Sequence, residues 1–216
     1  MHPALAVNVL DPSSLIEAFG LLGVLGIVFA ETGLLIGFFF PGDSLLFTAG
    51  FFASGATAAV GLRLPLWALL VGGPVFAIAG AQTGYYIGVK TGPRLFNRPD
   101  SRLFKREYVE RAEYYFDKFG PAKAVVLARF IPVVRTFLNP VAGTLGMDAK
   151  TFFAWNVVGG ILWVDGVVSL GYFLGTVIPG VDRYLLPAIG VVVIISVLPV
   201  VLEVIKARRA KTAIRD

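Results

Sequence analysis

Long apolar stretches, separated by short polar segments, dominate this chain. Four apolar regions lie at about 18–60, 64–89, 121–178 and 184–205. A helix needs about 20 residues to cross the hydrocarbon core of a bilayer. The second and fourth regions each fit one crossing, the third is too long for one, and the first is interrupted by acidic residues and a proline. The pattern predicts an all-α integral membrane protein with a single membrane domain over residues 1–216.

The composition supports a membrane protein and narrows its chemistry. Of the 216 residues, 56% are hydrophobic and 15% are charged, and the mean hydropathy is +0.79. Soluble domains usually carry about 25% charged residues, so these values argue against a soluble enzyme and exclude a disordered chain. The chain has no cysteine, and its one histidine is His2. We therefore expect no disulfide, no metal site, no cofactor and no enzymatic activity.

The basic residues, which outnumber the acidic ones to give a net charge of +5, gather in two clusters at 90–123 and 206–215. This charge suits an anionic membrane surface and does not require a nucleic-acid partner. The positive-inside rule places both clusters, and with them the C-terminus, in the cytoplasm. The chain between them must then cross the membrane an even number of times. Three candidates lie there, at 124–146, 151–178 and 184–205, so one of them must enter and return.

Segment 124–146 suits a broken, re-entrant path, and an unbroken spanning helix stays open as the alternative. Its helix breakers and polar residues are Arg129, Pro132, Arg135, Asn139, Pro140 and Gly143. Irregular backbone at membrane depth is tolerated only where protein or a wet cavity covers it. With this segment re-entrant, 64–89 runs inward, 151–178 runs outward and 184–205 returns to the cytoplasm. The first 62 residues contain no Lys or Arg, so their orientation stays open.

A glycine pattern occurs twice, 87 residues apart. The two copies are Gly72-Gly73 with Gly84-Tyr85-Tyr86-Ile87-Gly88, and Gly159-Gly160 with Gly171-Tyr172-Phe173-Leu174-Gly175. A charged residue, a proline and an Ala-Gly pair lie upstream of each copy. Because the charges give the copies opposite directions, we expect an inverted repeat, about 15–90 and 121–180, as in secondary transporters. The first broken segment, about 24–52, would enter from the outer face and the second from the inner face.

Between the halves, a cytoplasmic connector spans 91–120 and contains an amphipathic helix at 107–119. The apolar residues of this helix recur at the spacing of one helix face. It either lies on the cytoplasmic membrane surface or packs on the underside of the bundle. Gly120-Pro121 ends it. The final spanning helix at 184–205 carries the second basic cluster as its tail.

Ionisable residues at membrane depth are costly and usually functional. The apolar regions contain Glu31, Asp43, Arg129, Arg135, Asp148 and Asp165. Two acids lie in the first broken segment and two arginines in the second. If both segments meet at the midplane, two carboxylates would face two guanidinium groups. Structural ion pairs are one explanation, and a substrate or ion site is the other, because the backbone is broken at the same places.

The residue types favour an anion such as phosphate at this site. Arginine has a planar fork that binds two oxygens and stays charged, so we expect Arg129 and Arg135 to bind a phosphate group. Carboxylates at membrane depth can carry protons, which is the role expected for Glu31 and Asp43. Asp165 lies in the second repeated helix and is expected to form an interhelical hydrogen bond or to support transport.

The remaining polar and aromatic residues receive structural assignments. Asp148 is expected at the membrane interface, where it caps the helix that begins near Thr151. Trp67, Trp155 and Trp163 are expected to be interface anchors or packing residues.

One further motif points to a known family. The run Arg129-Phe130-Ile131-Pro132-Val133-Val134-Arg135, followed by Asn139-Pro140-Val141-Ala142-Gly143, resembles the signature of the DedA family. The stretch from Glu31 to Phe40-Pro41-Gly42-Asp43 and both Gly-Tyr-x-x-Gly elements are similar as well, so the resemblance covers about residues 15–180. Members of this family are bacterial inner-membrane proteins that share the VTT domain with eukaryotic lipid scramblases.

The resemblance implies a multi-pass protein with two re-entrant hairpins that face each other. Several family members are implicated in returning undecaprenyl phosphate to the inner leaflet, which recycles the lipid carrier of cell-wall synthesis. The important acids of the family fall on Glu31 and Asp43, and its important arginines on Arg129 and Arg135. The expected supporting residues are Asn139 and Asp165, and the expected hairpin and packing residues are Pro41, Gly42, Pro132, Pro140 and Gly143.

The leading hypothesis is therefore a proton-coupled flippase for a polyprenyl lipid phosphate, with membrane lipid and protons as its partners. A proton-coupled transporter of another small solute or ion is the second hypothesis. A non-transporting membrane scaffold or a general lipid scramblase is the third. A lipid phosphatase is disfavoured because the usual phosphoryl-accepting nucleophiles are missing. The sequence leaves homo-oligomer formation open.

Overall fold

The structure is a computed structural model, which describes residues 12–34, 41–55, 64–95, 114, 116 and 118–177. Every regular element within these residues is helical, as the sequence predicts, and none is a strand. The helices are α1 (Pro12–Gly33), α2 (Gly42–Ala53), α3 (Leu66–Leu95), α5 (Pro121–Ala128), α6 (Pro132–Thr144) and α7 (Ala149–Val177). The predicted spanning helix at 184–205 lies outside the described residues.

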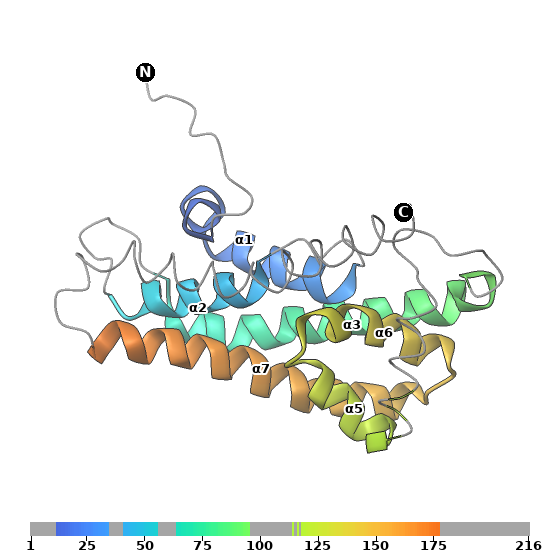
Figure 1. The fold of residues 1–216 in the computed structure, drawn as a ribbon. Coiled ribbons are helices and arrows are strands. Elements are labelled where there is room, and N and C mark those ends of the chain that lie inside the picture. Colours follow the sequence, from blue (N-terminus) through green and yellow to red (C-terminus); the bar gives the residue numbers. More distant parts are fainter. Residues whose placement is uncertain are drawn as a thin grey trace, which may run out of the picture.

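Helices α3 and α7 are the two long elements of the bundle and lie side by side (Figure 1). They are antiparallel, since Gly73 of α3 lies against Val164 of α7 while Ile78 lies against Gly160. Among the described residues, these two helices are long and apolar enough to cross a membrane, over 27 residues from Leu66 and 29 residues to Val177. At 1.5 Å per residue, each is about 40 Å long. They correspond to the segments predicted at 64–89 and 151–178.

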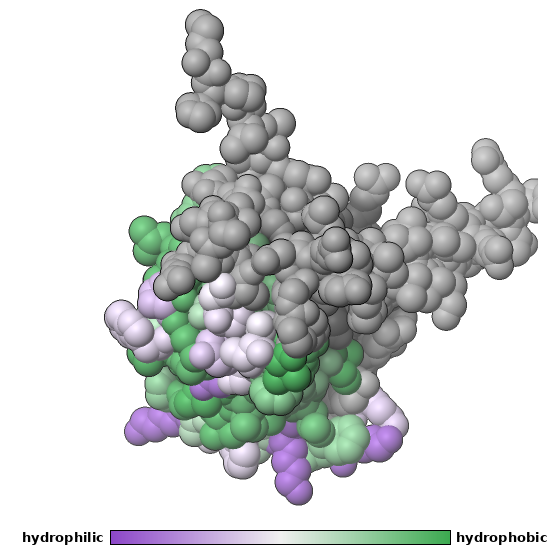
Figure 2. All heavy atoms as spheres, turned by 90° about the vertical axis from the view of Figure 1, so that its left-hand side faces the viewer, coloured by the Kyte–Doolittle hydropathy of each residue, from purple (hydrophilic) through white to green (hydrophobic). Residues whose placement is uncertain are grey.

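Apolar side chains cover much of the described surface, which suits contact with lipid. Among the coloured residues in the end-on view of Figure 2, hydrophobic ones predominate, with a paler patch between them and a few hydrophilic residues projecting at the margin. The outward-facing apolar residues of α3 and α7 include Trp67, Val71, Val75, Phe153, Val158, Ile161, Leu162, Leu170 and Phe173. Trp67, predicted as an interface anchor, is 73% exposed at the beginning of α3.

Helix α1 lies along the first half of α3, and α2 packs against α7. After a non-helical residue at Gly20 (φ 58°), α1 follows α3 in parallel, so that Leu25 lies beside Gly72 and Gly33 lies beside Gly84. The helix ends there, close to the middle of α3. The chain then returns as α2 along α7, in the direction of the N-terminal end of α3.

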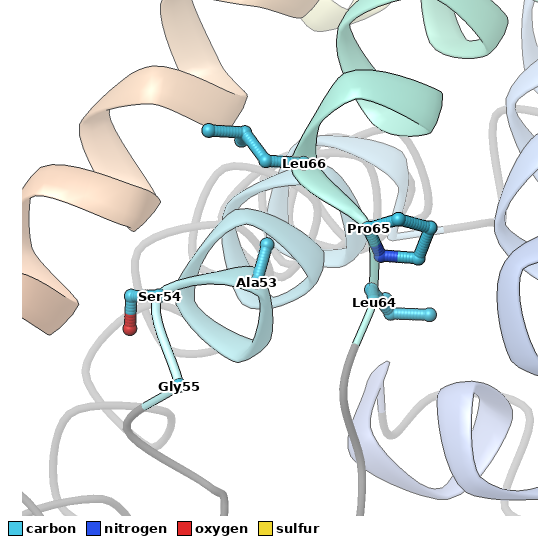
Figure 3. A pocket seen from close by; sticks show the side chains of 6 residues that line it. All are labelled: Ala53, Ser54, Gly55, Leu64, Pro65 and Leu66. Carbon is cyan, nitrogen blue, oxygen red and sulfur yellow. The ribbon is translucent and has the colours of Figure 1, made fainter.

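The ends of α2 and α3 lie together. A pocket is lined by Ala53, Ser54, Gly55, Leu64, Pro65 and Leu66, which come from the end of α2 and the start of α3 (Figure 3). None of these six side chains is charged. The lining residues show that the end of α2 lies beside the beginning of α3.

The second broken segment consists of α5, which packs against α7, and α6, which packs against α3. Helix α5 ends at Ala128, the backbone at Ile131 is extended (φ −116°, ψ 105°), and α6 begins at Pro132. Proline fits this first helical position because it lacks an N–H that would have no partner there. Helix α6 then runs toward the C-terminal end of α3, where Thr144 lies beside Gly92. The predicted break in 124–146 is therefore present, at residues 129–131.

Each returning helix packs against the long helix of the other half through closely approaching backbones. A Cβ at Gly50 of α2 would collide with the Val168 carbonyl of α7, and a Cβ at Gly143 of α6 would collide with the Tyr85 carbonyl of α3. Gly50 and Gly143 are the two Ala-Gly glycines of the repeated pattern. Small residues of this kind let membrane helices approach closely. Each of the two interfaces therefore includes a glycine of an Ala-Gly pair at a close backbone approach.

The connector is described only near its end. Of the predicted amphipathic helix 107–119, the described residues 114, 116, 118 and 119 are helical, and Phe116 is buried. The helix ends at Gly120 (φ 77°), and Pro121 begins α5, so the predicted end at Gly120-Pro121 is confirmed. Asp148 caps α7, because its carboxylate accepts hydrogen bonds from the Thr151 backbone N–H (2.8 Å) and hydroxyl (2.9 Å).

Candidate functional site

The two helix breaks meet near the middle of the bundle and bring four ionisable residues into it. Glu31 lies in the last turn of α1, Asp43 in the first turn of α2, and Arg135 in the first turn of α6. Arg129 follows the end of α5. Glu31, Arg129 and Arg135 are each 6% exposed or less. The sequence therefore identified charges that share one buried region, although their pairing differs from the predicted one.

Arg135 pairs with both acids. Its Nη1 lies 2.8 Å from Asp43 Oδ1, and its Nη2 donates to Glu31 Oε1. The side chain of Asp43 is 36% exposed, whereas that of Glu31 is 3% exposed. The predicted arrangement of two carboxylates facing two guanidinium groups is thus wrong in detail. One guanidinium group serves both carboxylates, which leaves the second arginine in a different environment.

Trp163 completes this cluster from α7. Its indole N–H donates to Asp43 Oδ1 (2.7 Å), and its ring lies 4.5 Å from Cζ of Arg135. The side chain is 2% exposed, so Trp163 is a buried site residue and not an interface anchor. The buried position of Trp163 could have been predicted from sequence, because this residue lies midway along a 29-residue apolar helix. An indole N–H buried that deeply needs an acceptor.

Arg129 has an amide as its partner. Its Nη2 donates to Oδ1 of Asn156, and the Asn156 Nδ2 donates to the backbone carbonyl of Ile78 (3.0 Å). Asn156 is fully buried, and Ile78 lies near the middle of the span in α3. Nη1 of Arg129 is buried and has no hydrogen-bond partner among the described residues. Within that part of the chain, no carboxylate forms a salt bridge with Arg129.

Small and capping residues hold the acids in place. A Cβ at Gly42 would overlap Oε2 of Glu31, so a larger residue there would force the carboxylate to move from its present position. Pro41 precedes α2, and its carbonyl accepts the Leu45 N–H (2.8 Å). Asn139 of α6 donates to the Thr32 carbonyl at the end of α1 (2.9 Å), which ties the two breaks together beside Glu31.

The remaining predicted residues lie around this cluster. Pro132 begins α6, Pro140 lies within it, and the Pro140 carbonyl contacts Gly88. Asp165 is not joined to the four charges, and its Oδ1 is buried without a partner among the described residues, so the interhelical hydrogen bond expected for it is not found there. No group of three His, Cys, Asp or Glu residues in the described ranges is arranged to hold a metal ion.

The geometry separates two chemical tasks. Arg129 is a buried cation whose Nη1 has no hydrogen-bond partner among the described residues, and such a guanidinium nitrogen can donate to the oxygens of an anion. Arg135 is a cation for which two carboxylates compete. Protonation of either carboxylate would weaken its bond to Arg135 and make that guanidinium group available to another anion. The site can therefore bind an anion at one arginine and control access to the second.

Comparisons with known proteins place the chain in a family. The VTT domain model matches residues 40–173. The chain is 41% identical over 184 residues to Protein DedA of Escherichia coli (strain K12), covering 85% of this chain and 81% of that protein. It is 38% identical over 212 residues to an uncharacterized membrane protein of Mycobacterium tuberculosis (strain CDC 1551 / Oshkosh), covering 94% and 89%.

A further relative is an uncharacterized membrane protein of Mycobacterium leprae (strain TN), with 40% identity over 190 residues, 88% of this chain and 82% of that protein. No solved structure matches the chain significantly. The matched family model covers both helix breaks from Phe40 onward, including Asp43, Arg129 and Arg135. The chain therefore belongs to the VTT-domain family of membrane proteins, together with DedA.

Proposed function

We propose that this protein is a proton-coupled flippase that moves a polyprenyl lipid phosphate, such as undecaprenyl phosphate, between the leaflets of the bacterial inner membrane. The observation that carries the proposal is the buried Arg129, which has a free N–H face and no described carboxylate partner. An unpaired buried cation is costly unless an anion joins it. A phosphate headgroup meets this need, and its prenyl tail stays in the surrounding lipid.

The course of the two broken segments supports a transport mechanism. On this proposal, both are re-entrant hairpins, and together with α3 and α7 they form an inverted repeat. The first hairpin ends beside the start of α3 and the second ends beside its C-terminal end, so they enter from opposite faces. Sites of secondary transporters lie at broken helices near the midplane of such repeats. The C-terminal cluster of basic residues is then cytoplasmic.

Protons would act through the shared arginine. Glu31 and Asp43 both bond to Arg135, so their protonation releases this guanidinium group for the phosphate. Loss of the protons restores the ion pairs and expels the anion. This cycle requires no cofactor, metal or covalent step, and we propose no enzymatic activity for the chain.

The function is tested with purified protein in lipid vesicles. Saturable binding of undecaprenyl phosphate by the wild-type protein is expected, with loss of binding in Arg129→Ala and Arg135→Ala. Leaflet transport of the same lipid should follow an imposed pH gradient and should stop in both variants. A folded wild-type protein that does not bind the lipid would overturn the cargo and favour another solute or a scaffolding role. Normal transport by Arg129→Ala would overturn the assignment of the site.

The hairpins have a separate test, because the chain contains no cysteine and needs no background substitutions. Ser54→Cys lies at the end of the first hairpin and Leu145→Cys at the end of the second. In oriented cells, a membrane-impermeant maleimide added outside should label the first variant and leave the second unlabelled until the membrane is opened. Labelling of both from the same side would refute hairpins that enter from opposite faces.

A further inference from the structure

Asn156 is the residue that decides the electrostatic environment of Arg129. It lies in α7, is fully buried, and accepts the Nη2 hydrogen bond of Arg129 through its side-chain oxygen. Its Nδ2 donates to the carbonyl of Ile78 in α3. One amide therefore joins the second helix break to both long helices. No other hydrogen bond of the Arg129 guanidinium group is found within the described residues.

The contrast with Arg135 shows what this amide does. Both arginines are buried, and both donate Nη2 to a side-chain oxygen. The oxygen that faces Arg135 belongs to a carboxylate, whereas the oxygen that faces Arg129 belongs to a neutral amide. An aspartate at position 156 would have nearly the same shape and would accept the same hydrogen bond. At the Nη2 contact the two arginines thus differ by one charge, and Arg135 has a second carboxylate, Asp43, at Nη1.

We propose that Asn156 is a positioning residue that makes Arg129 selective for phosphate, because it fixes the guanidinium group in place without neutralising its charge. This inference rests on the proposed function and adds to it a residue outside the four charges. A carboxylate here would act as an internal competitor for the anion. The group that Arg129 would recognise is a phosphate with free oxygens, either as the monoester headgroup of a lipid or as phosphate in solution.

The decisive variant is Asn156→Asp, which keeps the shape and the acceptor for Arg129, adds a negative charge, and loses the donor to the Ile78 carbonyl. The new carboxylate and the bound phosphate would lie on opposite sides of the Arg129 guanidinium group, roughly 7 Å apart. At an effective dielectric constant of about 20, their repulsion is large enough to weaken anion binding on the order of fiftyfold. Binding of undecaprenyl phosphate should fall by about this factor. Binding of undecaprenol, which has the same tail and no charge, should change by less than about threefold. The ratio of the two affinities separates electrostatics from packing, since a packing defect affects both lipids.

Two further variants complete the experiment. Thr176→Asp adds the same charge at an exposed position of the same helix, 20 residues away and so roughly 30 Å along its axis. It should keep its affinity for undecaprenyl phosphate. Asn156→Leu removes both hydrogen bonds of the amide without adding charge. It should weaken phosphate binding by about tenfold, close to the size of the lost hydrogen bond to the charged Arg129. This variant decides the question if Asn156→Asp is not recovered as a folded protein.

The outcomes are distinct. If the wild-type protein binds neither undecaprenyl phosphate nor inorganic phosphate, the proposed function is refuted, and the role of Asn156 is refuted as well. Wild-type binding of the lipid, with less than about a tenfold loss in Asn156→Asp or an equal loss for undecaprenol, overturns the role of Asn156 alone. Competition by inorganic phosphate at millimolar concentration would show that the headgroup suffices, and its absence would show that the lipid tail is needed too.

Discussion

The same substitution at the two arginines of the site should have unequal effects on stability. Arg135→Gln removes the one cation that serves Glu31 and Asp43, and it leaves two carboxylates without their described ion pair. Arg129→Gln removes a buried cation that has no described carboxylate partner. Glutamine keeps an amide donor in both cases, so the comparison isolates the charge. The pair of variants tests whether the arginines have unequal roles.

The magnitudes follow from burial. Removing one member of a buried ion pair typically costs about 3–5 kcal/mol, because the remaining charge is uncompensated. For a chain of this size, 1 kcal/mol shifts the unfolding temperature by about 2–4 °C, so Arg135→Gln should lower it by roughly 6–20 °C. Arg129→Gln loses a hydrogen bond to a charged group, worth about 1.5–3 kcal/mol, and also removes the cost of burying an unpaired charge. These contributions oppose each other, so its stability should change by less than about 1 kcal/mol or rise.

The measurement is thermal unfolding of the purified protein in detergent, followed by the loss of the monodisperse fraction on size-exclusion chromatography. The same preparations are then tested for lipid-phosphate transport, which both variants should lose. A double variant with Glu31→Gln and Arg135→Gln should recover part of the lost stability, because it removes a charge together with its partner. Equal destabilisation by Arg129→Gln and Arg135→Gln would refute the division of roles derived from the structure.

Three further predictions concern the supports of the site and of α7. Gly42→Ala should lower stability by about 1–3 kcal/mol and reduce transport, because its methyl group overlaps the Glu31 carboxylate; Gly26→Ala, which meets no atom within 4 Å, is the control, and equal unfolding temperatures would contradict the prediction. Trp163→Phe should cost about 1–3 kcal/mol in thermal unfolding, since Asp43 loses its indole donor while the aromatic packing remains; an unchanged unfolding temperature would contradict this. The Thr151 backbone N–H, followed by its hydroxyl, lowers the pKa of Asp148. The cap therefore stabilises α7 above the ordinary aspartate pKa and is lost as the pH falls through the lowered one, so the deficit of Asp148→Ala in unfolding temperature should be present at pH 7 and disappear in acid.

The break between α5 and α6 could be located from local sequence, because it depends on local chemistry. Pro132 cannot continue a preceding helix and fits the start of the next one. Arg129 and Arg135 on either side of it are too costly to face lipid. Both facts are visible in a seven-residue motif. The two long helices could be predicted equally well, because a sufficiently long apolar run in a membrane has few alternatives to a spanning helix.

The pairing of the charges could not be read in the same way. Equal numbers of acids and arginines suggest two ion pairs, yet both acids bond to Arg135. The partner of Arg129 is 27 residues away in sequence, on a helix whose register against the break is fixed by packing at Gly159. One asparagine in an apolar helix has many structural uses, so its type alone does not single it out. Trp163 was missed for the same reason, although its depth in the span was a usable signal.

Charge balance explains why a transporter of anions would place two acids on one arginine. With both carboxylates ionised, Glu31, Asp43, Arg129 and Arg135 sum to zero. A phosphate monoester brings a charge of about −1.5 to −2 near neutral pH, and moving that charge through a low-dielectric interior is costly. Protons taken up by the acids cancel it, and each of them also detaches a competitor from Arg135. Protonation of the two acids thus neutralises the cargo and also makes Arg135 available as its second binding group. Two separate ion pairs would instead leave neither arginine free to make the first contact with the phosphate.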